Sequence, residues 1–258
     1  MKASDLDRFC AGLMPERRTP ESVDGIKTGE GAKELRKVGV TWTVTNAVLD
    51  KAERLGLDGI VTHEPTFFDH HDSAESRTAS ETARAKQKRI DELGLVIIRL
   101  HDCWDGYPEY GIGDATARVL GWTERLEATD IGRVFRLAET TLADLARDVA
   151  DKLGCPNPRI FGDPATKISV VGLCWGHTSL GSVVRCTEAG ADCVVVGELA
   201  EWQGPQYILD SGKTMIYAGH CTTEKKGMET ARELLEKNFA DVEFIYIDVP
   251  EAFGPPVL

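Results

Sequence analysis

Short apolar runs alternate with longer amphipathic segments along most of the chain. The short runs are rich in Val and Ile, which is typical of buried strands, and the longer segments repeat their apolar residues at helical spacing. Strands are predicted over residues 37–45, 58–62, 95–100, 132–137, 159–162, 167–173, 192–197, 214–219 and 242–249. Helices are predicted over residues 46–56, 80–94, 114–122, 141–154, 179–190, 200–211 and 223–239. This alternation predicts an α/β fold with helices packed on sheets.

The pattern repeats itself within the chain. Residues 52–65 (AERLGLDGIVTHEP) resemble residues 186–199 (CTEAGADCVVVGEL), with a glycine, an aspartate and a final glutamate at equivalent places. In each copy the next predicted strand ends in a histidine that is followed four positions later by an acid: His101 and Asp105 in the first copy, His220 and Glu224 in the second. Two matches in the same order indicate a duplicated α/β unit.

The duplication predicts a domain organisation. Residues 1–125 would form the first α/β half, residues 126–166 an inserted α+β middle section, and residues 167–258 the second half. The halves would pack about a pseudo-twofold axis as one compact unit, which would bring equivalent strand ends together. We therefore expect a binding site between the halves.

Candidate ligands stand directly after predicted strands. In open α/β sheets, ligands bind at the carboxyl ends of the strands. The residues expected there are His63, Glu64, His101, Asp105, His220 and Glu224. Imidazole with carboxylate suits a divalent ion such as Zn, Mn, Fe, Co or Ni, and carboxylates can bridge two ions at roughly 3.5–4 Å. From the residues alone, a structural role for each histidine stays open.

Several other polar residues have two interpretations. The structural interpretation is a solvated loop for His70 and His71, a turn for His177, a solvated helix face for Lys225 and Lys226, and packing for Cys103 and Cys221. The functional alternatives are a proton shuttle for the paired histidines, a substrate contact for His177 and a phosphate clamp for the lysines.

Composition narrows the class of protein. The net charge of −12 argues against a nucleic-acid partner, although a bound metal could still attract a phosphorylated small molecule. No apolar stretch is long enough to predict a membrane span. The seven cysteines include no Cys-x-x-Cys pair, so we expect reduced thiols in a cytoplasmic protein and no structural zinc site.

Three ordered motifs resemble those of the Nif-three-like proteins, many of which are named GTP cyclohydrolase I type 2 homologues. The motifs are IVTHEP at residues 60–65, HDCWDGYPEYG at 101–111 and GHCTTE at 219–224, and the similarity runs from about residue 25 to 250. The resemblance implies a toroidal homohexamer with two divalent ions per chain. The ligands it implies are His63, Glu64, Asp105, His220 and Glu224, with His101 close by.

The sequence departs from that family's pattern in two places. Glu64 stands where the family has a second histidine, and GELAEWQ (residues 197–203) lacks the histidines that many relatives carry after the glutamate. Glutamate adds a negative charge and a harder ligand. Neighbours on an extended chain point to opposite faces, so either the strand bends at His63 and Glu64 or each residue faces a different ion. We expect the second arrangement.

The predicted function is that of a dinuclear metal protein with hydrolase-type chemistry on a small, nucleotide-like substrate. Water at open metal positions would become the nucleophile, and His101 or His71 would carry protons. The alternative is a non-catalytic, ring-shaped metal-binding or protein-interaction module, whose ions would hold the two halves together.

Overall fold

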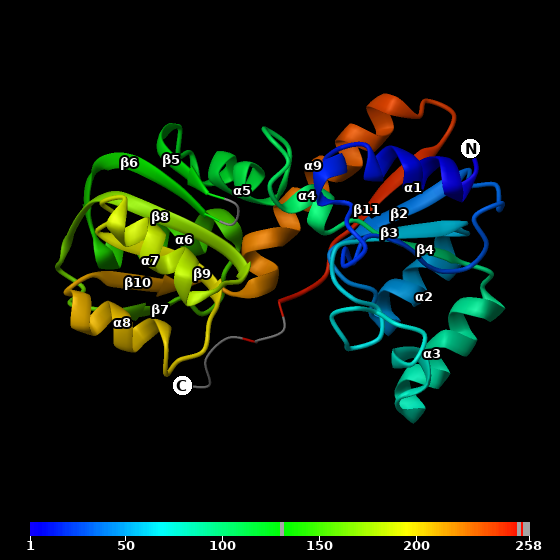
Figure 1. Ribbon diagram of the computed structural model, residues 1–258, viewed down its shortest axis with the longest axis horizontal. Coiled ribbons are helices and arrows are strands. Elements are labelled where there is room, and N and C mark those ends of the chain that lie inside the picture. The colour runs from blue at the N-terminus through cyan, green and yellow to red at the C-terminus, as the bar shows by residue number, and fades with distance from the viewer. Residues whose placement is uncertain (130–131, 252–253, 255–258) are drawn as a thin grey trace. The chain divides into compact units, whose positions relative to one another are not determined.

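The computed structural model describes residues 1–129, 132–251 and 254, and it confirms a mixed α/β fold (Figure 1). The chain divides into two compact units. The first unit comprises residues 1–110 and 228–249, and the second comprises residues 111–227 and 250–258. Within the described ranges, no helix combines the length and the apolar character needed to cross a bilayer.

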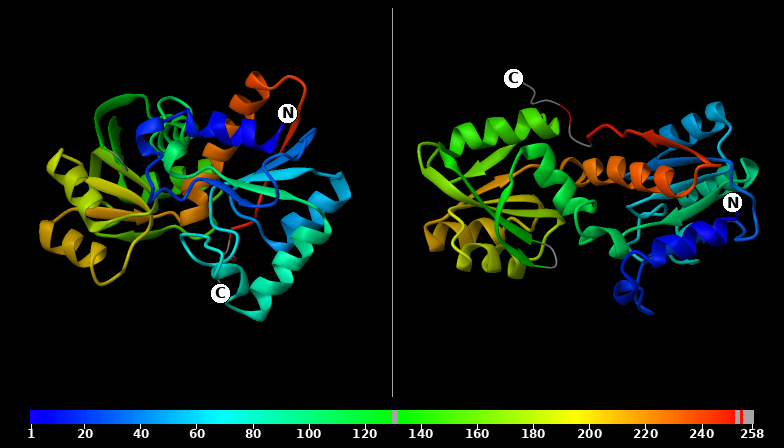
Figure 2. Two further views of the ribbon diagram at one scale, coloured as in Figure 1. Left: turned by 45° about the vertical axis from the view of Figure 1, so that its right-hand side comes forward. Right: turned by 90° about the horizontal axis from the view of Figure 1, so that it is seen from above.

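The first unit is a sheet covered by helices on both faces. Its strands are β1 (Gly25–Thr28), β2 (Lys37–Thr41), β3 (Gly59–Thr62), β4 (Val96–Arg99) and β11 (Glu243–Ile247). Its helices are α1 (Ala3–Ala11), α2 (Asn46–Leu55), α3 (Glu81–Glu92), α4 (Asp102–Asp105) and the part of α9 (His220–Asn238) that follows Gly227. Helix α1 and the part of α9 after Gly227 lie on one face of the sheet, and α2 and α3 lie on the other (Figure 2).

Strand order in the first sheet explains where its candidate residues lie. The order is β1-β4-β3-β2-β11, and every neighbouring pair is parallel except β1 with β4. In the ladder Thr41 is opposite Thr62, and Thr62 is opposite Arg99, so β2, β3 and β4 end at the same edge. His63 and His101 follow β3 and β4 closely and therefore emerge at that shared edge.

The second unit contains a larger mixed sheet. Its strands are β5 (Glu124–Thr129), β6 (Gly132–Thr141), β7 (Arg159–Phe161), β8 (Lys167–His177), β9 (Cys193–Glu198) and β10 (Thr214–Tyr217). Its helices are α5 (Ile112–Leu120), α6 (Leu142–Leu153), α7 (Leu180–Glu188), α8 (Gly204–Ser211) and the first part of α9. The strand order is β5-β6-β8-β9-β10-β7, with β8, β9 and β10 parallel. Helices α5 and α6 cover one face, and α7 and α8 the other (Figure 2).

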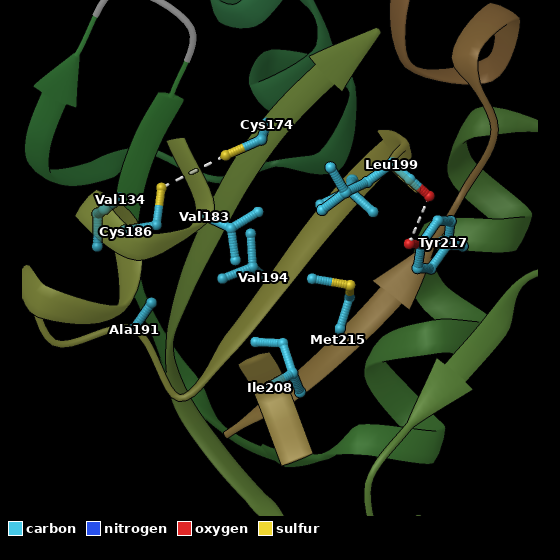
Figure 3. Close-up of a cluster of buried hydrophobic side chains, with 11 residues drawn as sticks. Val134, Cys174, Val183, Cys186, Ala191, Val194, Leu199, Ile208, Met215 and Tyr217 are labelled. Atoms are coloured by element: carbon cyan, nitrogen blue, oxygen red, sulfur yellow. Dashed lines mark hydrogen bonds between the residues drawn. The ribbon is translucent and has the colours of Figure 1, made fainter. Parts of the chain in front are cut away.

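The core of the second unit fixes the end of β9. Side chains from the sheet, α7 and α8 form one buried cluster (Figure 3). Leu199, directly after β9, packs into this cluster, and the buried Tyr217 hydroxyl donates a hydrogen bond of 2.9 Å to the Leu199 carbonyl. The chain is therefore anchored immediately beyond Glu198, the last residue of β9.

Local structure agrees with the internal similarity. Asp58 Oδ2 accepts hydrogen bonds from the N–H groups of Arg36 and Lys37 before β2 pairs with β3. At the equivalent place, Asp192 Oδ2 accepts from the N–H groups of Ser169 and Val170. Each aspartate thus ties its own strand to the neighbouring parallel strand where the pairing of the two begins. The twofold relation between the copies stays a prediction.

The two compact units divide the chain differently from the segments predicted above. Strands β6 and β7, which fall in the predicted middle section 126–166, are hydrogen-bonded into the same sheet as β8, β9 and β10. The second boundary falls inside α9, between Gly227 and Met228, because β11 returns to pair with β2. Two of the described strands, β1 and β5, were not predicted, because their sequences GIKT and ERLEAT contain few apolar residues.

A candidate metal centre

The chain bends where β3 ends, at His63 and Glu64. The N–H groups of both residues donate to one acceptor, the carbonyl of Trp42, at 3.2 and 2.8 Å. Two successive amides cannot point to one side in a regular extended strand, so the bend lets both side chains face the same region. One potential ligand atom from each of His63, Glu64 and His101 lies within 4.8 Å of the others. We expected His63 and Glu64 to lie on opposite sides of an extended strand. In the structure the chain bends there, and their ligand atoms lie close together.

His63 is completely buried, and its ring is oriented by the backbone. Its Nδ1 lies 3.0 Å from the Leu100 carbonyl oxygen, which can only accept, so Nδ1 donates. In the neutral ring the lone pair is then on Nε2, which lies 3.6 Å from Asp105 Oδ1. An imidazole whose other nitrogen donates to a carbonyl is the usual arrangement of a metal-ligating histidine.

The ring of His101 is oriented in the same way as that of His63, but by a carboxylate instead of a backbone carbonyl. It is the residue before α4, and its Nδ1 lies 3.0 Å from Asp102 Oδ1, while its Nε2 lies 3.8 Å from Glu64 Oε1. Burial alone would raise the pKa of Asp102, but hydrogen bonds from His101 and from the Val23 N–H outweigh it and hold the pKa well below its usual range. Asp102 is therefore an anionic acceptor that fixes the ring of His101.

Asp24 holds the backbone at the same place. Its carboxylate accepts hydrogen bonds from the N–H groups of His101 and Cys103, the latter at 2.8 Å. The rings of His63 and His101 stack at 4.5 Å between centroids. Asp105, one turn along α4, places its two oxygens 3.6 Å from His63 Nε2 and 3.6 Å from His101 Nδ1. The first unit thus gathers two imidazoles and two carboxylates, with Glu64 as the second carboxylate.

The second unit carries a matching group at the start of α9. His220 is the first residue of the helix rather than a residue before it, so Glu224 lies one turn later on the same side. His220 Nδ1 lies 3.1 Å from Glu198 Oε1, and Nε2 lies 3.1 Å from Glu224 Oε2. The hydrogen bond from His220 lowers the pKa of Glu198, with the nearby His177 adding to the effect.

Gly176 makes room for this group. It has a φ of +60°, which favours glycine, and a Cβ at this position would lie 1.9 Å from Glu224 Oε1 and 3.2 Å from His220 Nε2. Its N–H donates to Thr223 Oγ1 at 3.0 Å, which ties the end of β8 to the first turn of α9. The glutamate therefore sits directly against bare backbone.

The remaining polar candidates are the paired histidines, His177 and the lysines at the start of α9. His70 and His71 are exposed, but the His70 ring lies edge-on to His101 at 5.6 Å and to His71 at 5.3 Å, so the pair forms a row with the half-buried His101 and the buried His63. Partial desolvation of the ring, and then the charge of Arg99, lowers the pKa of His70. His177 ends β8 opposite Glu198 and is exposed, and Lys225 forms an ion pair with Glu251.

The cysteines fit the packing interpretation. All seven, each within the described part of the chain, are buried free thiols. Burial raises the pKa of Cys103 to about 12 and that of Cys221 further, as expected for thiols in apolar surroundings.

The donor set fits a transition-metal ion. Nitrogen and oxygen ligands bound at about 2.0–2.2 Å lie roughly 3–4 Å apart around one ion. The separations of 3.6 and 3.8 Å in the first unit, and of 3.1 Å in the second, fall in this range. Three supporting residues were not assigned a role from the sequence: Asp24, Arg99 and Asp102. Glu198 matches Glu64 in the internal repeat, and that match could have identified Glu198 as part of the site.

Comparisons with known proteins find relatives by sequence and similar folds by structure. A relative from Pseudomonas aeruginosa, named GTP cyclohydrolase 1 type 2 homolog, is 28% identical over 230 residues, which is 86% of each chain. Among solved structures, protein ybgI, described as of unknown function, has a TM-score of 0.85 at 24% identity and covers 98% of this chain and all of its own. The Staphylococcus aureus protein SA1388 has a TM-score of 0.85 at 19% identity, covering 98% and 99%.

The two structural likenesses concern the fold, and the family assignment rests on the sequence match. The DUF34/NIF3 family model (NGG1p interacting factor 3) matches residues 1–252, which include every candidate ligand described above. The resemblance inferred from the three motifs is thereby confirmed, and the chain belongs to the DUF34/NIF3 family.

Proposed function

We propose that the chain binds two divalent metal ions and that it hydrolyses a small, nucleotide-like substrate. The proposed ligands are His63, Glu64, Asp105, His220 and Glu224. The name of the relatives includes GTP cyclohydrolase, which supports a nucleotide-like substrate. Bound ions of this kind would supply Lewis acidity and acidify water.

One recurring arrangement carries the proposal. In His63, His101 and His220, Nδ1 faces an oxygen acceptor and Nε2 faces a carboxylate 3.1–3.8 Å away. A lone pair pointing at an anionic oxygen is repulsive unless a cation lies between them. At a single ring this cation could be a proton. Three such rings among several carboxylates favour divalent ions instead.

The row of imidazoles supports the proposed proton carriers. From the buried His63, ring contacts lead through His101 and His70 to the exposed His71. Histidine exchanges protons near neutral pH, so such a row can connect a buried site with solvent. We propose His101 and His71 as proton carriers, with His101 also placed to bind an ion through Nε2.

Metal analysis and a substrate screen test the proposal. Protein purified without added metal should contain about two divalent ions per chain by elemental analysis, and should hydrolyse at least one member of a panel of nucleotides and phosphate esters. EDTA should abolish that hydrolysis. Protein that binds no ion even after metal is added would contradict the centre, and two ions without turnover would reject the hydrolase assignment.

Glu198→Ala should weaken metal binding without removing the ligand itself. The substitution removes the acceptor that orients His220, and loss of such a supporting partner typically costs about 10–100-fold in affinity. Competition titration with a chelating dye measures the change. The control is Glu201→Ala, because Glu201 is a nearby exposed acid that pairs with Arg159. Equal affinities in the two variants would remove Glu198 from the site.

We also propose a cytoplasmic homohexamer, the assembly implied by the motif resemblance. The seven free thiols support a reducing compartment.

A further inference from the structure

Arg99 is a buried cation at the end of β4. Its side chain is completely inaccessible, and its guanidinium faces the bend that carries Glu64. Nε donates to the His63 carbonyl at 2.8 Å, and Nη1 donates to the His70 carbonyl. Nη2, which is also buried, lies 3.9 Å from Glu64 Oε2. Because arginine keeps its proton in proteins, a permanent positive charge is enclosed beside the candidate metal centre.

The charge of Arg99 needs a compensating anion. The carboxylates that act on it are Glu64, Asp72, Asp102 and Asp24, with Glu64 the strongest, and Lys27 is the cation that shares its surroundings. The three aspartates also accept backbone hydrogen bonds: Asp72 from Thr66 and Phe67, Asp102 from Val23, and Asp24 from His101 and Cys103. Glu64 is the acid that forms the ion pair.

The two oxygens of Glu64 have different neighbours. Oε2 faces the Arg99 guanidinium at 3.9 Å, while Oε1 faces His101 Nε2 at 3.8 Å. The guanidinium attracts one oxygen and so turns the other toward the imidazoles. A carboxylate held in this way can offer an ion one oxygen but not both.

We propose that Arg99 is a positioning residue that neutralises Glu64 and restricts it to binding a divalent ion through Oε1. The inference rests on the proposed dinuclear centre and adds how this chain accommodates a carboxylate beside His63. Together, Glu64 and Arg99 contribute no net charge, so the pair is electrostatically equivalent to a neutral ligand. The net charge of the centre is then less negative than the number of its carboxylates suggests. A less negative centre favours the approach of an anionic substrate.

A double-mutant cycle tests this coupling. The variants are Glu64→His, Arg99→Leu and the two combined, and the measurements are the dissociation constant of the weaker-bound ion and the free energy of unfolding in EDTA. Glu64→His keeps a ligand but removes the negative charge, which leaves Arg99 uncompensated. The substitution should therefore weaken metal binding at least roughly tenfold more in the wild-type background than in the Arg99→Leu background. It should also destabilise the metal-free protein more in the wild-type background.

Lys86→Met provides the matched control. Lys86 is also a buried cation that holds this loop, since its Nζ donates to the carbonyls of Val44 and Thr66 at 2.7 and 2.8 Å. Glu64→His should cost the same in the Lys86→Met background as in the wild type. Additive effects of Glu64→His and Arg99→Leu in both measurements would overturn the proposal. If Glu64→His and Arg99→Leu are coupled in EDTA but the wild-type protein binds no metal, the dinuclear centre is refuted. The ion pair between Glu64 and Arg99 is then still supported.

Discussion

His220→Ala should remove most of the bound metal. The residue places Nε2 beside Glu224 and is itself held by Glu198, so its loss takes away one ligand and the group that orients the other. Metal that binds only the folded protein stabilises it by about 2.7 kcal/mol at a concentration 100 times the dissociation constant. The variant should lose stabilisation of that order in metal-containing buffer. Elemental analysis and thermal unfolding with and without EDTA measure both effects.

His177→Ala is the control for this prediction. His177 is an exposed histidine of the same unit, opposite Glu198 in the ladder, and is not among the proposed ligands. The His177→Ala variant should retain wild-type metal content and the wild-type response of thermal unfolding to EDTA. If His220→Ala keeps the full metal content, the assignment of the second ligand group is wrong.

Gly176→Ala should damage the same ligand group through the backbone. A Cβ would overlap Glu224 Oε1 at 1.9 Å, so either the glutamate or the end of β8 must move. The positive φ adds a cost of about 1–2 kcal/mol for a residue other than glycine. We expect a loss of metal affinity of at least roughly tenfold together with lower stability in EDTA, measured by chelator competition and by denaturant unfolding.

Gly154→Ala separates the overlap from the backbone cost. Gly154 ends α6 in the same unit with a φ of +70°, and no atom lies within 4 Å of the added Cβ. It should lose a similar 1–2 kcal/mol from conformation alone but should bind metal normally. Equal metal affinity in the two glycine variants would show that Glu224 does not depend on the space at Gly176.

The strand-end histidines could be predicted because their sequence signal is local. An apolar run followed directly by a histidine and an acid marks the carboxyl end of a buried strand, and the fold bears out this placement for His63 and His101. His220 was expected after a strand and is instead the first residue of α9. The glycine before it, Gly219, has a φ of +99°, and the chain turns there directly into the helix.

The supporting residues could not be predicted in the same way. Arg99 ends a run of apolar residues, and a charged residue there normally indicates solvent, whereas its burial depends on carbonyls from a loop that is remote in sequence. The contact between Asp24 and the start of α4 joins residues 77 positions apart. The bend at Glu64 depends on the Trp42 carbonyl, which belongs to the neighbouring strand's end.

The first sheet is completed only by the last part of the chain. Strand β11 pairs with β2 at the sheet edge, and the Thr41 hydroxyl donates to the Ile247 carbonyl 206 residues away. All six strands of the second sheet, in contrast, lie within residues 111–227. On the ribosome the second sheet can therefore form while the first still lacks an edge strand, because elements that contact one another generally fold together during synthesis. The ligands His63, Glu64 and Asp105 are made early, yet the sheet that presents them is finished last.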